Sequence, residues 1–257
     1  MFTRAIVRPP APNFAEGLTT VDLGRPSVEA ALAQHEAYCR ALESRGLALT
    51  RLPADPRFPD STFVEDTAVI PERGGAVLTR PGAPSRAGEV SGIEAALAPF
   101  FPALRRIEAP GTVDGGDVCE AAEHFFIGVS RRTDEEGARQ LAAFLAADGY
   151  SATLVDIRGH DDILHLKSGI AWLGDKNLVV IDSLAGDPAF RGWDPIRVPR
   201  GEEYAANCVL VNDEVFFAEG FPLLERELRD RGYRLTVLAQ SEFQKMDGGL
   251  SCLSLRF

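Results

Sequence analysis

The chain has 257 residues, of which 45% are hydrophobic and 25% charged, which is ordinary for a globular protein with a large buried core. Its 27 basic residues against 38 acidic ones give a formal net charge of −11, which disfavours nucleic acid and anionic membranes and fits a small cationic substrate. No stretch approaches the roughly 18 apolar residues of a membrane span, and the first residues hold too short an apolar run for a secretory signal, so we expect a cytoplasmic protein.

The four cysteines argue against stabilisation by cross-links. None belongs to a C-x-x-C pair of the kind that structural zinc sites and redox motifs use. The cytoplasm would keep them reduced. We therefore expect neither disulfides nor a structural zinc site.

A pattern of helix, glycine and strand recurs along the chain. Helices are predicted to end at three glycines, each followed by a strand: Gly46, Gly149 and Gly232. The helix predicted over residues 134–147 has Leu141, Phe144 and Leu145 on one face, and Thr133-Asp134-Glu135-Glu136 before it is typical of a capping box. We expect such helices to pack one face on a sheet.

Pairs of short strands around a polar turn precede most of the helices. In chain order the pairs are 68–70 with 76–78, 117–118 with 125–127, 170–172 with 178–181, and 208–211 with 215–217. The three stretches of helix, glycine and strand and two weaker copies, which end at 104–107 and 195–198, make about five modules of some fifty residues. We therefore expect an α/β fold, a closed ring of five ββαβ modules, as one domain over residues 1–257.

Polar clusters occur at or near the starts of the predicted strands. They are residues 59–66, 114–117, 165 and 247–252. Because strand starts converge on the axis of such a ring, we expect these clusters to meet in one central cleft.

Cys252 and His165 are candidates for covalent catalysis by a thiol. Cys252 follows Gly248 and Gly249, which permit a tight turn, but a lone cysteine is as often a small buried side chain. His165 has apolar neighbours and could be a core histidine, yet its imidazole titrates near neutrality, as an acid and base must. A nucleophile and a base from distant segments fit covalent catalysis.

Two acidic segments are candidates for binding a cation. Asp114-Gly115-Gly116-Asp117 can clamp a flat cation, although an ordinary acidic turn has the same composition. The segment 58–66 is more informative, because it interleaves three acids with Phe63, whose ring face also attracts cations. Those acids are Asp60, Glu65 and Asp66.

Seven segments, in family order and over nearly the whole chain, resemble the dimethylarginine dimethylaminohydrolase family of the guanidine-modifying pentein superfamily. They are residues 58–66, 79–83, 111–117, 130–133, 164–168, 205–208 and 248–254. The resemblance implies a five-bladed α/β propeller with pseudo-fivefold symmetry. It also implies hydrolysis of Nω-methylated L-arginine (asymmetric dimethylarginine or monomethylarginine) to L-citrulline and dimethylamine or methylamine, with no metal or organic cofactor.

The resemblance also implies individual roles. Cys252 would be the nucleophile that forms a thiouronium intermediate, His165 the general acid and base, and Asp114 its carboxylate partner, a position that is Glu in some relatives. The substrate would contact Leu18 on a mobile lid, Asp60 at the α-amino group, Phe63, Glu65, Asp66 at the guanidinium, and Arg86 and Arg132 at the α-carboxylate. If the loop at 85–88 aligns differently, Arg80 would replace Arg86.

Three alternatives remain. Arginine deiminase or amidinotransferase activity, in the same superfamily, would need the same residues; chain length and the segment Leu18-Thr19-Thr20 resemble the dimethylarginine enzyme more. A non-catalytic binder of arginine-like ligands would not need Cys252. A thiol hydrolase acting on peptides fits the acidic site less well, because its substrate is a neutral amide. Exposed sheet edges would favour a homodimer, as in some relatives, but no stretch of this sequence identifies the interface.

Overall fold

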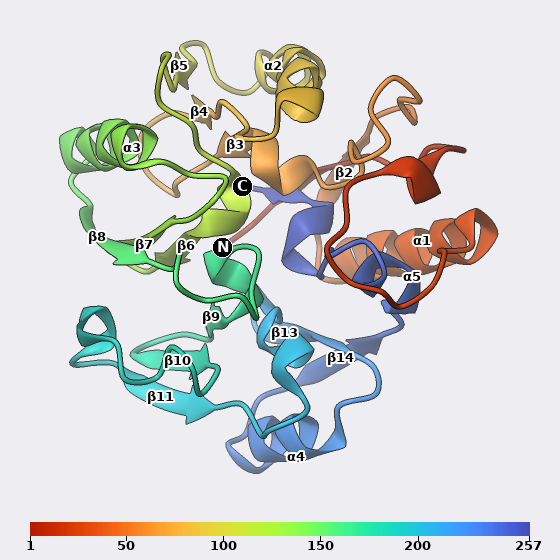
Figure 1. The fold of residues 1–257 in the computed structure, drawn as a ribbon, viewed down its shortest axis with the longest axis vertical. Coiled ribbons are helices and arrows are strands. Elements are labelled where there is room, and N and C mark those ends of the chain that lie inside the picture. The colour runs from red at the N-terminus through yellow and green to blue at the C-terminus, as the bar shows by residue number, and fades with distance from the viewer.

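The structure, a computed structural model, describes residues 1–257, and its strands form five small sheets around one axis (Figure 1). Each sheet has three strands, and its central strand pairs antiparallel with the inner strand and parallel with the outer one. From inner to outer strand the sheets are β15 (Leu255–Arg256), β1 (Arg4–Val7), β2 (Ala48–Arg51); β3 (Ala68–Val69), β4 (Val77–Leu78), β5 (Arg105–Arg106); β6 (Val118–Ala121), β7 (His124–Val129), β8 (Ser151–Asp156); β9 (Ile170–Trp172), β10 (Asn177–Val180), β11 (Asp194–Arg197); and β12 (Val209–Val211), β13 (Glu214–Ala218), β14 (Leu235–Leu238). The predicted ring of five modules is confirmed.

Helices cover the outside of the ring in four modules (Figure 1). They are α1 (Val28–Ser44), α2 (Val90–Leu97), α3 (Glu135–Ala147) and α4 (Pro222–Asp230), and a short α5 (Ser241–Gln244) follows β14. The fourth module has only the 3-10 turn η6 (Pro188–Phe190) at this place, because Gly186 and Pro188 interrupt a short connection. None of the helices combines the length and the apolar character that crossing a membrane requires.

The predicted helix ends are confirmed. Gly46, Gly149 and Gly232 have φ angles of 87°, 86° and 89°, in the left-handed region that favours glycine. The predicted capping box before α3 is shifted by one residue. Asp134 is the N-cap and accepts a 2.7 Å hydrogen bond from Gly137 N, whereas the Thr133 hydroxyl donates to Asp117 of another turn. Sequence spacing alone cannot choose between two adjacent capping residues.

Replacing Gly46 by alanine should destabilise the fold through its φ angle alone. No atom lies within 4 Å of a Cβ placed there, so the expected loss is about 1 kcal/mol, or a Tm lower by about 2–4 °C. Gly159→Ala is the matched control, because its Cβ is also uncrowded and its φ lies outside the left-handed region. Thermal unfolding measures both, and equal melting temperatures would contradict this account.

The hydrophobic core lies between neighbouring modules. Successive side chains of a strand point to opposite faces, so β7 contributes to two cores. Phe125 packs edge-to-face on Tyr150, with ring centroids 5.1 Å apart, and Phe126 packs on Phe190 of the next module at 5.1 Å. Burial of one such ring contributes about 1.5–3 kcal/mol, which holds adjacent sheets together.

A 3-10 turn leads into the inner strand of every sheet. The turns are η8 (Ser251–Leu253), η2 (Val64–Thr67), η4 (Gly115–Asp117), η5 (Leu166–Ser168) and η7 (Glu203–Ala206). η2 contacts η8 and η4, and η5 contacts η4 and η7. Asn207, which ends η7, accepts a 3.0 Å hydrogen bond from Ser251 N and so links the two remaining turns. The five turns therefore form a closed ring, and the predicted polar clusters lie on it or next to it.

Candidate active site

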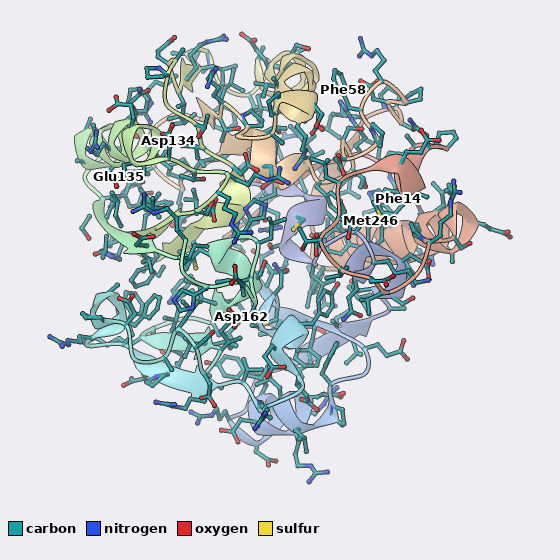
Figure 2. All side chains as sticks on the ribbon, in the orientation of Figure 1. Phe14, Phe58, Asp134, Glu135, Asp162 and Met246 are labelled. Carbon is teal, nitrogen blue, oxygen red and sulfur yellow. The ribbon has the colours of Figure 1, made fainter.

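A small cavity of about 30 Å³ adjoins this ring of turns. It is lined by Leu18, Asp60, Phe63, Asp66, Arg86, Arg132, Leu164, His165, Met246, Asp247, Gly248 and Cys252. Eight of the ten residues predicted for the site are among them, and the exceptions are Asp114 and Glu65. Met246 lies near Phe14, on the side of the ring formed by α1 and α5 (Figure 2).

Cys252 is held in a turn that depends on two glycines. A Cβ on Gly248 would lie 2.2 Å from the ring of Phe63, and one on Gly249 would lie 2.4 Å from the side chain of Asn207. The absence of these side chains lets the turn approach both neighbours, and Gly249 N donates to Cys252 Sγ at 3.4 Å. The thiol thus reaches the cavity while only 9% of Cys252 is exposed.

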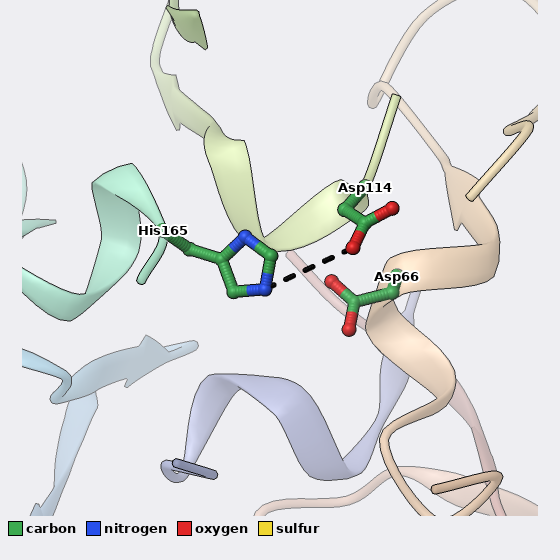
Figure 3. A group of neighbouring side chains, drawn as sticks. All are labelled: Asp66, Asp114 and His165. Carbon is green, nitrogen blue, oxygen red and sulfur yellow. Dashed lines mark ion pairs between the residues drawn. The ribbon is translucent and has the colours of Figure 1, made fainter. Parts of the chain in front are cut away.

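His165 faces the carboxylates of Asp66 and Asp114 (Figure 3). Its Nε2 lies 3.9 Å from Asp114 Oδ2, and ligating atoms of Asp66, Asp114 and His165 lie within 4.8 Å of one another. Asp114 is fully buried; its Oδ1 accepts from Gly82 N at 2.8 Å, but its Oδ2 has no hydrogen-bond partner. A buried acceptor without a donor is costly, so this oxygen is suited to an N–H of a bound ligand.

The pKa values of Asp66, Asp114 and His165 shift in different directions. Burial would raise the pKa of Asp66, but Arg86 and His165 outweigh it and lower that pKa to about 2. Burial and the negative charge of Asp66 raise the pKa of Asp114 to about 6. Burial lowers the pKa of His165, but the neighbouring carboxylates, Asp117 first, raise it to about 9. At neutral pH the group therefore combines an imidazolium with carboxylates and can accept a further cation.

The thiol of Cys252 is protonated at neutral pH in this structure. Burial, followed by the negative charges of Glu65 and Asp66, raises its pKa to about 12. A cation bound beside these carboxylates would offset their charge and favour the thiolate.

Arg86 and Arg132 both line the cavity, but they differ in how many hydrogen bonds their guanidinium groups make. Arg86 is buried and donates to Asp66, to Glu89 through Nε at 3.0 Å and Nη2 at 2.8 Å, and to two backbone carbonyls. The Arg132 guanidinium makes no hydrogen bond, and its Nη1 lies 3.8 Å from Asp114. Arg80, the predicted substitute for Arg86, is exposed and donates to the carbonyls of Pro110 and Gly111, away from the cavity.

The Glu65 carboxylate belongs to a second, larger cavity of about 560 Å³ along the inner strands. It accepts from Ser251 Oγ at 2.7 Å and pairs with Lys167 Nζ at 2.6 Å. Successive residues of a 3-10 turn are rotated by about 120°, so Glu65 and Asp66 point into different spaces. The Glu65 side chain therefore does not line the small cavity, and its predicted contact with a ligand stays a prediction.

The predicted lid lies closed over the small cavity. Leu18 N donates to Asp60 Oδ1 at 3.0 Å, Thr19 Oγ1 donates to Lys245 O at 3.0 Å, and Thr20 N donates to Asp247. A volume of about 30 Å³ is far below the roughly 300 Å³ or more of pockets that hold small-molecule ligands. An amino-acid ligand can therefore enter only when this segment moves.

Asp66, Asp114 and His165 also have the spacing of a metal site. Each oxygen of Asp66 accepts one hydrogen bond, from Gly116 N at 2.8 Å and from Arg86, and can accept a second, whereas the protonated imidazole of His165 is no metal ligand. The donor set therefore fits a guanidinium better than a metal ion.

Two residues to which the sequence analysis gave no individual role support the site. Asn207 accepts from Ser251 N at 3.0 Å and donates to Lys167 O at 3.0 Å, which fixes the turn beside Cys252. Asp117 is fully buried and accepts a hydrogen bond from Leu166 N at 3.0 Å, next to His165. Both residues lie just before an inner strand, as the predicted polar clusters do, and this position could have identified them from the sequence.

The chain is similar to curated proteins over its full length. It is 45% identical to an N(G),N(G)-dimethylarginine dimethylaminohydrolase of Pseudomonas aeruginosa, with 100% of both chains covered. It is 34% identical to an enzyme of the same name from Streptomyces coelicolor, over 98% of this chain and 96% of that one. A family model described as arginine deiminase matches residues 60–197.

Solved structures agree with these similarities. The fold superposes with a TM-score of 0.96 on the Pseudomonas aeruginosa enzyme, in a cysteine-to-serine variant complexed with citrulline, at 44% identity and 100% coverage of both chains. The N-terminal domain of ArgZ, a cyanobacterial arginine dihydrolase, has the same fold with a TM-score of 0.84 at 18% identity, over 100% of this chain and 97% of that one. From the full-length identity and the shared five-bladed fold, the chain belongs to the dimethylarginine dimethylaminohydrolase family of the pentein superfamily.

Proposed function

We propose that this protein hydrolyses Nω-methylated L-arginine, such as asymmetric dimethylarginine, to L-citrulline and the corresponding methylamine. The observation that carries the proposal is the meeting of Asp66, Asp114 and His165 beside the cavity that Cys252 reaches, where Asp114 Oδ2 is buried and accepts no hydrogen bond. A guanidinium placed there would supply the missing N–H donor. The names of the full-length relatives support the same substrate.

The proposed reaction has two covalent steps. Asp66 and Asp114 hold the guanidinium, whose charge lowers the proton affinity of the Cys252 thiol, and the thiolate attacks the central carbon. The bond from that carbon to the methylated nitrogen breaks while His165 Nε2 gives this nitrogen a proton, which leaves a thiouronium on Cys252. His165 then takes a proton from water, whose oxygen attacks the same carbon, and citrulline leaves as the thiol is restored.

The α-carboxylate and the α-amino group of the substrate need binding partners of their own. Arg132, whose guanidinium makes no hydrogen bond and lies 3.8 Å from Asp114, is the proposed partner of the α-carboxylate. Arg86 would join it only by releasing its bond to Asp66. Asp60, now bonded to Leu18 N, is the proposed partner of the α-amino group, and Phe63 would pack on the substrate beside it. The lid must therefore exchange its contact with Asp60 for the substrate.

Further parts of the proposal concern the whole chain. We propose that residues 1–257 act as one domain, in the cytoplasm, as a homodimer and without a metal or organic cofactor. Arginine deiminase is the second candidate, because a family model of that description matches residues 60–197 and the same side chains would serve it.

Product analysis tests the proposal. The purified protein is incubated with asymmetric dimethylarginine or with arginine, and citrulline, dimethylamine and ammonia are measured. We expect kcat/KM for the methylated substrate to exceed that for arginine by about 10-fold or more, which corresponds to about 1.4 kcal/mol of discrimination. Ammonia formed mainly from arginine would assign a deiminase, and saturable binding of both amino acids without product would assign a binder.

A further inference from the structure

Asp117 is a buried carboxylate that the proposed reaction does not use. It is fully buried at the end of η4 and does not line the small cavity. Its Oδ2 accepts from Ser130 Oγ and from Thr133 Oγ1, both at 2.7 Å, and its Oδ1 accepts from Leu166 N at 3.0 Å. Three donors compensate its negative charge and fix its orientation.

The same carboxylate faces the side of the His165 ring that points away from Asp114. His165 Nδ1 lies 3.4 Å from Asp117 Oδ2, is buried and has no hydrogen bond to any other group. The opposite nitrogen, Nε2, is directed towards Asp114. A separation of 3.4 Å is long for a hydrogen bond, and such contacts in catalytic sites often shorten when substrate binds.

We propose that Asp117 is a positioning residue that keeps a proton on His165 Nδ1, so that Nε2 is the atom that exchanges protons with the leaving amine and with water. It holds the histidine in two ways, through the ring nitrogen and through the backbone N–H of Leu166, the next residue. This inference rests on the proposed hydrolysis for its role in turnover, but the tautomer itself can be measured without substrate.

The electrostatic consequence has a definite sign. The charged and titratable groups around His165 are Asp66 from η2, Asp117 from η4, Asp114 at the N-cap of η4, Cys252 from η8, and Asp60, Arg86, Arg132 and Asp247, which line the same cavity. Burial lowers the pKa of His165, and among the carboxylates that raise it to about 9 Asp117 comes first. Removal of the Asp117 charge must therefore lower the pKa of His165, because imidazolium loses more stabilisation than neutral imidazole.

Asp117→Asn is the appropriate variant, since it removes the charge and retains the shape. Thr133 Oγ1 accepts from only one backbone N–H, so its second lone pair can accept from the new amide while the amide oxygen keeps the bond from Leu166 N. An amide N–H that faces Nδ1 would favour an unprotonated Nδ1 and leave the neutral ring with its proton on Nε2, which is the wrong tautomer for a base.

We expect kcat of Asp117→Asn at neutral pH to fall about 10²-fold, with KM changed less than about threefold, because Asp117 does not line the cavity. The pH dependence of kcat/KM should shift its His165 limb downwards by about one unit or more. Ser130→Ala is the matched control, because it removes one hydroxyl bonded to Asp117 but leaves the charge, and its pH profile should match that of the wild type.

Nitrogen NMR of the wild type shows which ring nitrogen of neutral His165 carries the proton, even if the variant does not fold. The chain has four histidines, so His165 can be assigned by substitution. Above its pKa, the neutral ring should carry its proton on Nδ1. A proton on Nε2, or an Asp117→Asn variant with unchanged tautomer and pH profile, would overturn the inference. A wild type that shows the Nδ1 tautomer but no turnover of methylarginine would refute the proposed function and leave the positioning contact intact.

Discussion

Replacing Cys252 by serine is expected to reduce citrulline formation from asymmetric dimethylarginine by about 10⁴-fold or more. Serine has almost the same shape, so the turn formed by residues 248–252 should persist. Its hydroxyl, however, has a much higher pKa than a thiol and is a weaker nucleophile, and the site offers no base that touches it. Bound guanidinium can promote a thiolate but cannot generate an alkoxide at neutral pH.

The measurement pairs turnover with binding. Calorimetry should show that Cys252→Ser still binds the methylated substrate, because Asp66, Asp114 and Arg132 are unchanged. Cys208→Ser is the control, since this cysteine is buried beside the larger cavity and should keep turnover within a few fold of the wild type. Turnover by Cys252→Ser comparable to that of the control would exclude the covalent mechanism.

Replacing His165 by alanine should lower kcat by about 10³-fold, within the range typical for loss of a general acid and base. The methylated amine cannot leave without a proton, and water cannot attack efficiently without a base. With S-methyl-L-thiocitrulline, whose thiolate leaving group needs no proton, the first step should survive. The variant should then accumulate a covalent adduct on Cys252, which mass spectrometry of the intact protein detects.

His160→Ala is the control for this experiment. His160 is partly exposed, lies 3.9 Å from Asp162 and does not line the small cavity. It should turn over normally and accumulate no adduct. If His165→Ala released citrulline from the methylated substrate at the wild-type rate, another group would have to supply the proton, and the role proposed for Asp117 would also lapse.

The architecture was predictable because it follows from local rules. Gly46, Gly149 and Gly232 each end a helix through the backbone conformation alone, and a polar turn between two short apolar runs indicates each strand pair. The helix-free fourth module still registered as a weak copy, since its strands kept their pattern. Recurrence of one unit five times then fixed the ring, and with it the meeting of residues remote in sequence.

The details of the site depend on contacts that sequence does not encode locally. Glu65 and Asp66 are adjacent in sequence, yet the 3-10 turn sends their carboxylates into different cavities. Likewise, Asp114 and Asp117 flank one pair of glycines but face opposite nitrogens of His165. The sequence predicted that Arg86 binds the α-carboxylate of a ligand, but it did not indicate the hydrogen bonds that Arg86 donates to Glu89 and Asp66. Each outcome depends on side-chain direction in three dimensions.

The pairing of β15 with β1 brings the first and last residues of the chain together, which makes circular permutation possible. Thr3 N donates to Phe257 O at 2.9 Å, so a short linker could connect the two ends. Met1 and Phe257 border the larger cavity and not the one beside Cys252, so such a linker would leave substrate entry clear. A circular permutant opened at the exposed Gly159 would place His165 near its start and Asp114 after Cys252, with the same five turns meeting at the axis.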